Sequence, residues 1–369
     1  MKLPTVEDVA RSAQVSRQTV SNVLNAPSVV REATRTRVEA AIAELGYRPN
    51  LSARRLRQQK SATIGIRLDP QRNGISGGIL DRFVHALTEQ ADARAMRVLL
   101  FTADGPGSEI EQIRRLRDGA DVDAFVLTAT FHCDPRTEWL IENRIPFVTF
   151  GRPWGIDDMN DPRHRWVDID GRKGVYDATK HLLDSGARRI GWLGWPRPSG
   201  TGDDRRRGWE DAMRDSLGTS DDELVALSTE SFDGVPQASD AIARRLQTQQ
   251  MLDGLVCASD TLALGAMIAV ASAPGLADLP IIGFDNTPVA EAVGLSSVEQ
   301  PLDLVAAGAL ELLLGPLGDS VIPRQPSVAP QHRLIPPVLM MRKTNHLPLY
   351  GTTRTTADAA GNHNRKETS

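Results

Sequence analysis

Apolar residues in the first 48 positions recur with helical spacing in three short segments. Within each segment they lie at or near i, i+3 and i+4, so each segment would present one apolar stripe to a shared core. The three stripes are Val6, Val9, Ala10 and Ala13; Val20, Val23 and Leu24; and Val38, Ala41, Ile42 and Leu45. The pattern predicts three short helices around one small core in residues 1–48.

Polar residues mark the expected ends of these helices. Thr5, with Asp8 three residues later, forms a capping box at the start of the first helix, which should run to about residue 13. Ser16 is a suitable N-cap for the second helix, and Gly46 suits the position that follows the third.

The second helix turns a group of polar side chains outward together: Arg17, Gln18, Ser21 and Asn22. In a helix-turn-helix, the N-terminal residues of this helix reach base edges, where Arg can bind guanine and Gln can bind adenine. The alternative is that any three-helix bundle exposes polar residues. Charge favours DNA, because residues 1–60 carry eleven Lys and Arg against five Asp and Glu, a net charge of +6, whereas the rest of the chain carries −10.

Residues 51–60 form a short basic segment, LSARRLRQQK, in which Ala53 and Leu56 lie beside Arg54, Arg55 and Arg57. An isolated helix of this length is marginal in water, so we expect it to order only against a second copy or against DNA. Leu56 is then a candidate minor-groove wedge, with arginines on the flanking phosphates. A basic linker is the alternative.

From residue 61 onward, short apolar or β-branched runs alternate with amphipathic helical stretches. The predicted strands cover residues 64–66, 97–101, 124–128, 146–150, 166–170, 189–194, 254–259 and 280–285. This alternation is typical of an α/β fold with parallel sheets, and eight such units exceed one sheet. We expect two doubly wound subdomains, with the chain crossing between them near residues 161, 290 and 325.

Ligands of doubly wound folds bind at the carboxyl ends of the strands. Asp69, Ser259, Asp260 and Asp285 lie at such ends, and their oxygens can accept hydrogen bonds from sugar hydroxyls. Each of them could instead cap a helix. For Asp260, which directly precedes an apolar helix, that alternative is strong.

Aromatic and sulfur-containing residues add three further expectations. Trp154 and Trp195 lie in loops after strands, where an indole can stack on a pyranose ring. Cys133 and Cys257 lie far apart in apolar runs and are expected to be buried thiols. The tryptophans expected in the core are Trp139, Trp166, Trp192 and Trp209.

The motifs of several enzyme classes are missing from the chain. We find no GxxxxGK[ST] loop, no GxGxxG after a strand and no HExxH or clustered Cys/His spacing. We therefore expect no cofactor, no metal site and no enzyme. An export signal and a membrane-spanning apolar run are also missing, which predicts a cytoplasmic protein with no membrane partner. An α/β enzyme and a sugar-binding receptor without a regulatory role remain the alternatives.

Four motifs together resemble the lactose/galactose repressor (LacI/GalR) family: TVEDVA (5–10), VSRQTVSNVLN (15–25), GYRPN (46–50) and ARRL (53–56). The likeness continues to about residue 343. It implies a periplasmic-binding-protein-like body and a homodimer that reads a palindromic double-stranded DNA operator and responds to a sugar effector. The expected DNA contacts are Thr5, Ser16, Arg17, Gln18, Ser21, Asn22, Asn50, Ala53, Arg54, Leu56 and Arg57.

The resemblance also bears on the body. It implies effector contacts from Arg205, Phe232 and Asp285, to which we add Arg152 beside Trp154. The neighbouring Arg206 and Arg207 are expected to form a solvated face.

The chain departs from the family pattern at several positions. Gln14 occupies a turn position that is usually Gly, and Asn22 replaces the Arg found in some members. Arg31 stands where Ser or Thr would cap the third helix, and Ser259 replaces a common Asn. A change of base preference and an altered sugar geometry are therefore expected.

The sequence thus predicts a sugar-responsive transcriptional repressor with four parts. These are a helix-turn-helix head (1–48), a hinge helix (49–60), an effector-binding and dimerisation body (61–343) and a disordered tail (344–369). The tail has no Leu heptad, which favours a dimer over a tetramer.

Overall fold

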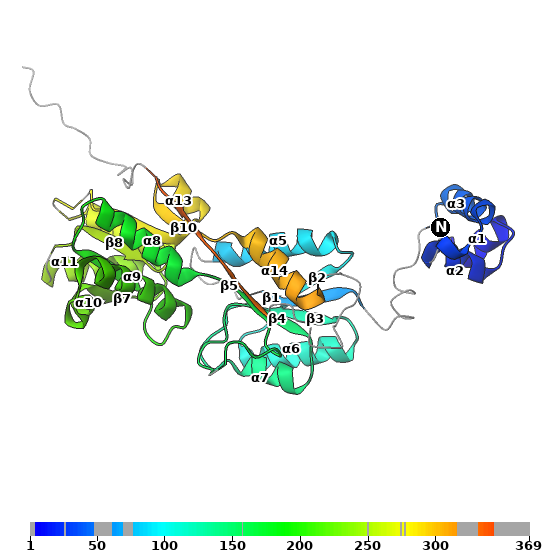
Figure 1. The fold of residues 1–369 in the computed structure, drawn as a ribbon, viewed down its shortest axis with the longest axis horizontal. Helices are drawn as coiled ribbons and strands as arrows, with labels where there is room; N and C mark the ends of the chain where they lie inside the picture. Colours follow the sequence, from blue (N-terminus) through cyan, green and yellow to red (C-terminus); the bar gives the residue numbers. More distant parts are fainter. Residues whose placement is uncertain are drawn as a thin grey trace, which may run out of the picture. The chain divides into compact units, whose positions relative to one another are not determined.

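The computed structural model describes residues 4–25, 27–47, 61–68, 77–156, 158–248, 251–273, 275–276, 278–315 and 331–342 (Figure 1). The chain divides into two compact units, residues 1–63 with 114–123 and residues 64–113 with 124–369. Ser61 and Ala62 belong with the short stretch 114–123 because their backbone N–H groups donate to the Asp123 carboxylate at 2.9 and 2.7 Å.

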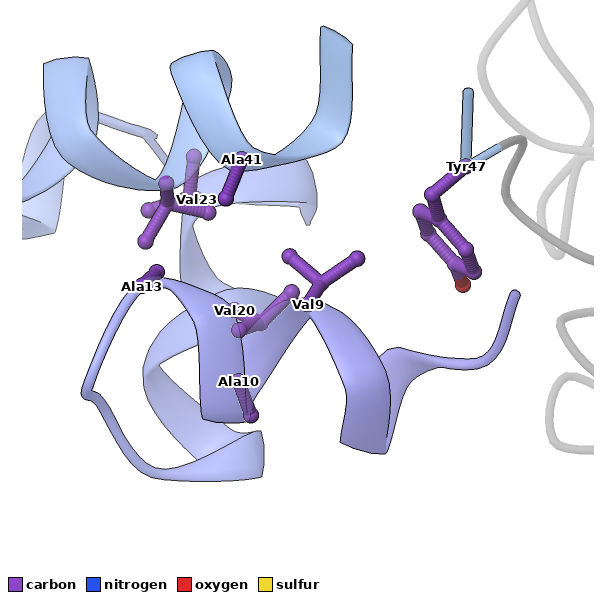
Figure 2. Packing of buried hydrophobic residues seen from close by; sticks show 8 residues of the cluster. Val9, Ala10, Ala13, Val20, Val23, Ala41 and Tyr47 are labelled. Carbon is purple, nitrogen blue, oxygen red and sulfur yellow. The ribbon is translucent and has the colours of Figure 1, made fainter. Parts of the chain in front are cut away.

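The head consists of α1 (Val6–Ser12), α2 (Arg17–Asn25), the short 3-10 helix η1 (Pro27–Val29) and α3 (Glu32–Leu45). All three predicted apolar stripes are confirmed, because they meet in one core (Figure 2). Tyr47, which follows α3, joins this core. Its fully or nearly buried members are Val9, Ala10, Ala13, Val20, Val23, Val38, Ala41 and Tyr47.

The predicted helix ends are also confirmed. Thr5 and Asp8 form a reciprocal capping box, and the Thr19 backbone N–H donates to Ser16 Oγ at 3.1 Å. Arg31 makes no side-chain cap at the start of α3. Gln14 has a left-handed backbone with φ of 53°, which costs a non-glycine residue about 1 kcal/mol.

The described residues of the body form two six-stranded sheets, which define an amino lobe and a carboxyl lobe. The amino-lobe order is β11-β5-β4-β3-β1-β2, and the carboxyl-lobe order is β12-β10-β9-β8-β6-β7. In the carboxyl lobe, β9 runs parallel to its neighbours β8 and β10, whereas β12 runs antiparallel to β10. In the amino lobe, β4 runs parallel to its neighbours β3 and β5. This confirms the predicted α/β architecture with two largely parallel sheets.

The strands of the amino lobe are β1 (Thr63–Leu68), β2 (Arg97–Thr102), β3 (Ala124–Leu127), β4 (Phe147–Phe150), β5 (Trp166–Ile169) and β11 (His332–Ile335). Its helices are α5 (Gly77–Asp92), α6 (Pro106–Asp118), α7 (Pro135–Glu142) and α14 (Leu302–Leu314). Helix α14 packs against α5 on one face of the sheet, and α7 lies on the other (Figure 1).

The strands of the carboxyl lobe are β6 (Ile190–Gly194), β7 (Ser228–Glu230), β8 (Gly254–Cys257), β9 (Ile281–Asp285), β10 (Ser296–Glu299) and β12 (Val338–Met340). Its helices are α8 (Gly171–Asp184), α9 (Thr201–Leu217), α10 (Asp221–Leu227), α11 (Val235–Thr248), α12 (Asp260–Ala271) and α13 (Pro288–Ala292). Helix α8 packs against α9, and α11 packs against α12.

The predicted crossings between the lobes are displaced. Because β5 and β11 pair within the amino-lobe sheet and β10 pairs within the other, the chain crosses after β5, after β10 and between β11 and β12. These places lie about ten residues beyond the predicted 161, 290 and 325. For the second and third crossings, the cause is that β10 and β11 are short and partly polar, so their sequences carry no clear strand signal. For the first, the strand at 166–170 was predicted, but its sequence does not record in which of the two sheets it pairs.

Burial confirms most of the core expectations. Trp166, Trp192, Trp209 and Cys257 are buried, whereas Trp139 is half-buried. Cys133 is exposed, so that prediction was wrong. Its backbone is left-handed, with φ of 56°, and its Sγ lies 3.3 Å from His132 Nδ1 in the loop that follows β3.

No described helix is long and apolar enough to cross a membrane. The described residues also contain no group of three or more His, Cys, Asp or Glu that could hold a metal ion.

Candidate functional site

The outer face of α2 presents the side chains that were predicted to read DNA. Arg17 and Gln18, at the start of the helix, are exposed, and Ser21 and Asn22 are half-buried. Gln18 Nε2 donates to Asn22 Oδ1 at 3.0 Å, which holds these two amides together one turn apart. The face therefore offers a guanidinium and amides at one helix end, as major-groove recognition requires.

Two of the other predicted contacts have structural roles at helix ends. The hydroxyls of Thr5 and Ser16 cap α1 and α2. Hydrogen bonds from Thr5 lower the pKa of Asp8, which keeps this carboxylate ionised as a capping partner. The remaining predicted contacts lie outside the described residues: Asn50, Ala53, Arg54, Leu56 and Arg57.

In the body, polar side chains from both lobes meet at the carboxyl ends of the strands. We call this set the interlobe cluster: Arg152, Trp154, Asp168, Trp195, Asp204, Arg205 and Asp285. Arg152, just after β4, donates through Nε to Asp168 at 2.9 Å and through Nη1 to Asp204 at 3.2 Å. Because Asp168 lies in β5 and Asp204 in α9, Arg152 joins the two lobes.

Burial dominates the electrostatics around Arg152. It raises the pKa of Asp168, and Arg152 opposes this shift. Burial would lower the pKa of Arg152, but Asp168 and Asp204 together raise it. The guanidinium is therefore a permanent positive charge shared by two carboxylates.

Arg205 and Asp285 form the second half of the cluster. Arg205 Nη1 donates to the Ala258 carbonyl oxygen at 2.6 Å and lies 3.7 Å from Asp285 Oδ1. Its guanidinium lies over Phe284, 3.6 Å from the ring centroid. Gln300 Nε2 donates to Asp285 at 2.6 Å, and burial raises the pKa of Asp285 to about 7 although Arg205 opposes the shift.

Three N–H groups of the interlobe cluster are buried without a hydrogen-bond partner among the described residues. They are Trp154 Nε1, Trp195 Nε1 and Arg205 Nε. Leaving a buried donor unpaired costs about 1–3 kcal/mol, so such groups need an explanation. Unpaired N–H donors of this kind are suited to a ligand that carries several hydroxyl groups.

Trp154 does not lie as its predicted stacking role requires. The residue is only 6% exposed, and Arg152 lies over its ring at 4.6 Å from the centroid. Gly200 packs so closely that a Cβ there would lie 2.7 Å from Trp154 Cγ. Because protein covers the ring, the indole N–H is what Trp154 offers here. Trp195 is half-buried beneath Arg205, at 5.5 Å from its ring centroid.

Asp260 is fully buried and is occupied by protein donors. Its Oδ1 accepts from Ser297 at 2.6 Å and its Oδ2 from the Thr287 backbone N–H at 2.7 Å. Both oxygens are thus engaged within the carboxyl lobe, and effector contact by Asp260 stays a prediction. The N-cap of α12 is Ser259, which also donates to Asp233 at 2.7 Å.

Four other residues with predicted roles lie outside the interlobe cluster as it is defined here. Phe232 is 75% exposed in the loop after β7, and Asp69 lies outside the described residues. Arg206 is not on a solvated face as predicted, because its side chain is 12% exposed and pairs with Glu210 at 2.9 Å. Arg207 is exposed.

The sequence did not single out several members of the site. Asp168 had a usable signal, because it is a charged residue within an otherwise apolar strand. Asp204 is indistinguishable from its neighbours in a run of charged residues. Arg82 on α5, which donates to the Asn286 carbonyl oxygen at 3.3 Å across the lobes, had no signal at all.

An open groove of about 560 Å³ lies elsewhere, between α8 and α9. None of the predicted effector residues lines it. Its lining residues are Tyr176, Lys180, Leu183, Asp184, Arg188, Asp215, Ser216 and Leu217.

Known proteins share both parts of this architecture. The profile of "Bacterial regulatory proteins, lacI family" matches residues 5–50, and that of "Periplasmic binding protein-like domain" matches residues 179–344. The HTH-type transcriptional regulator CelR of Thermobifida fusca is 32% identical over 322 residues, which are 84% of this chain and 91% of CelR. GalR of Escherichia coli K12 is 29% identical over 356 residues, which are 91% of this chain and 97% of GalR.

Solved structures give the same result. A CelR–cellobiose complex superimposes with a TM-score of 0.64 at 28% identity and covers 92% of this chain and 99% of its own. The lac repressor dimer bound to operator and an anti-inducer shares the fold, with a TM-score of 0.72 at 24% identity, and covers 94% of this chain and 100% of its own. The class defined by the fold and the helical head is that of DNA-binding transcriptional regulators. The chain belongs to the LacI family.

Proposed function

We propose that this protein is a repressor that binds a palindromic operator as a homodimer and is released when an uncharged sugar binds the interlobe cluster. The head contacts the major groove through α2, and residues 51–60 contact the minor groove. The protein acts by binding rather than catalysis, and it works in the bacterial cytoplasm, where its DNA target lies. The observation that carries the effector proposal is the set of unpaired N–H groups on Trp154, Trp195 and Arg205.

The preference for an uncharged ligand follows from the charges of the interlobe cluster. Arg152 is already paired with Asp168 and Asp204, and Arg205 with Asp285. Two cations therefore face three carboxylates, and an anionic ligand would find no unpaired cation among them. The CelR–cellobiose complex of a relative supports a sugar.

Coupling between the effector site and the DNA-binding head follows from the contacts that bridge the two lobes. The hydrogen bonds from Arg152 to Asp204 and from Arg82 to Asn286 both change if the lobes move relative to each other. An effector that binds one arrangement about 100-fold better than the other shifts their equilibrium by about 2.7 kcal/mol. That is enough to release an operator if the two heads can then no longer pair.

The proposal is tested with full-length protein and a panel of neutral sugars beside their uronate and phosphate forms. Operator fragments selected from genomic DNA report release in a mobility-shift assay, and calorimetry reports sugar binding. We expect a neutral sugar to bind and to release the operator. Tight binding of only the anionic forms would refute the assignment.

Arg205→Ala should abolish the effector response and retain DNA binding, because it removes the unpaired Nε and the partner of Asp285. Arg207→Ala is the matched control, since Arg207 is exposed on the same helix. An unaltered response in Arg205→Ala would remove this residue from the site.

A further inference from the structure

An ion pair joins two helices at the DNA-reading edge of the head. Glu7 lies in the first turn of α1 and Arg17 is the first residue of α2, and Arg17 Nη1 lies 2.9 Å from Glu7 Oε1. The other ion pairs among the described head residues join positions three or four apart on one helix: Asp8 with Arg11, Glu32 with Arg35, and Arg35 with Glu39. The Glu7 contact is thus set by the packing of α1 against α2.

Stability does not explain this pair. The side chains of Arg17 and Glu7 are 71% and 58% exposed, and ion pairs this exposed add little to folding. A carboxylate beside the recognition helix also repels the phosphates that the basic head attracts. Glu7 is therefore unfavourable for general DNA affinity, and its effect must be sought in how it acts on Arg17.

The guanidinium has N–H groups in a fixed planar fork. When Glu7 holds Nη1, the Nη2 and Nε edge of Arg17 remains available for the two-bond contact with guanine O6 and N7. Without this restraint, the Arg17 side chain can instead contact a phosphate of the DNA backbone. Such phosphates are present in DNA of every sequence, so this contact does not distinguish one sequence from another.

We propose that Glu7 is a specificity-determining residue, which aims Arg17 at guanine and disfavours its contact with phosphates. This inference rests on the proposed DNA-reading function of α2. It assigns a role to a residue of α1 that itself need not touch a base. Gln18 and Asn22 are held by their own hydrogen bond at 3.0 Å, so the base preferences that they set are independent of Glu7.

The test uses the full-length protein and an operator selected from random duplexes. Arg17→Ala first identifies the base pair that Arg17 reads, as the position where preference for guanine disappears. A two-bond contact of this kind gives about 5- to 150-fold discrimination. Glu7→Gln, which keeps the size and removes the charge, should reduce that discrimination by at least about threefold and tighten binding to random DNA.

Three controls separate this role from a general effect of charge or folding. Glu32→Gln breaks the pair with Arg35 on α3 and should leave all base preferences unchanged. Glu7→Gln in the Arg17→Ala background should change nothing at the identified base pair. Thermal unfolding should show that the Glu7→Gln head remains folded.

Three outcomes would overturn the inference. Glu7→Gln keeps the full preference for guanine, Glu32→Gln and Glu7→Gln have equal effects, or Glu7→Gln still changes the base preference at the identified position in the Arg17→Ala background. Failure of the proposed function is distinguishable, because the wild-type protein would then prefer no duplex over random DNA.

Discussion

The buried carboxyl of Asp285 should make the stability of the body depend on pH in a defined direction. Burial raises its pKa from an ordinary 3.8 to about 7 in the folded protein, and the facing groups that contribute are Arg205, Asp260, Asp233 and Gln300. Between these two values the folded state binds more protons than the unfolded state. The contribution of the Asp285 carboxyl to the free energy of unfolding is therefore fully present below about pH 4 and is lost as the pH rises to about 7.

The expected magnitude follows from the same values. The pKa of Asp285 lies about 3 above its ordinary value, and a difference of one in pKa corresponds to 1.36 kcal/mol. The free energy of unfolding should therefore fall by about 4 kcal/mol between pH 4 and pH 7. Asn at this position cannot ionise and can still accept a hydrogen bond from Gln300 through its side-chain oxygen. The Asp285→Asn body should therefore gain stability relative to the wild type as the pH rises, with little further change above pH 8.

Urea unfolding followed by tryptophan fluorescence measures this difference at each pH. Asp168, Asp260 and Glu109 also have pKa values raised by burial, so only the difference between wild type and variant isolates Asp285. Asp177→Asn is the control, because Asp177 forms an exposed pair with Lys173. A difference between wild type and Asp285→Asn that stays constant from pH 4 to pH 8 would refute the reasoning.

Three further outcomes are expected. Leu56→Ala should weaken operator binding severely in a mobility-shift assay and leave effector affinity nearly unchanged, and equal loss of both would defeat the wedge assignment. Gln14→Gly should stabilise the head by about 1 kcal/mol in thermal unfolding, because the left-handed φ of 53° suits Gly, and no gain would show that this turn carries no strain. Trp154→Phe keeps an aromatic ring of smaller size and removes Nε1, so calorimetry should show effector binding weakened by about 1 kcal/mol, whereas full affinity would mean that the indole N–H does not bind the effector.

The head was predictable almost in full because its determinants are local. Helical spacing fixed the stripe of each helix, and the capping box of Thr5 and Asp8 fixed where α1 begins. The cap of α2 by Ser16 and the left-handed Gly46 after α3 follow from the same short-range chemistry. The Arg17–Glu7 pair was not predictable, because it depends on how two helices pack.

The body was predictable as a class and only partly as a site. Strong apolar strands predicted the two parallel sheets, but β10 and β11 carry mixed patterns, so the second and third crossings were misplaced. Strand-end reasoning singled out Asp285, whereas Arg205 came from the family resemblance. The same reasoning cannot tell whether an acidic residue at a strand end faces a ligand or accepts hydrogen bonds from protein, as Asp260 does from Ser297 and Thr287.

The amino-acid sequence by itself determined the three-helix head, its basic charge, the polar face of α2 and the alternation that makes an α/β body. These depend on spacing and on interactions between residues a few positions apart. Only the tertiary structure decided that Arg152 joins Asp168 to Asp204, that Trp154 is covered by Gly200, and that Arg205 meets Asp285. The physical reason is that burial and charge pairing arise between residues far apart in the chain, and no short-range pattern records which of them will meet.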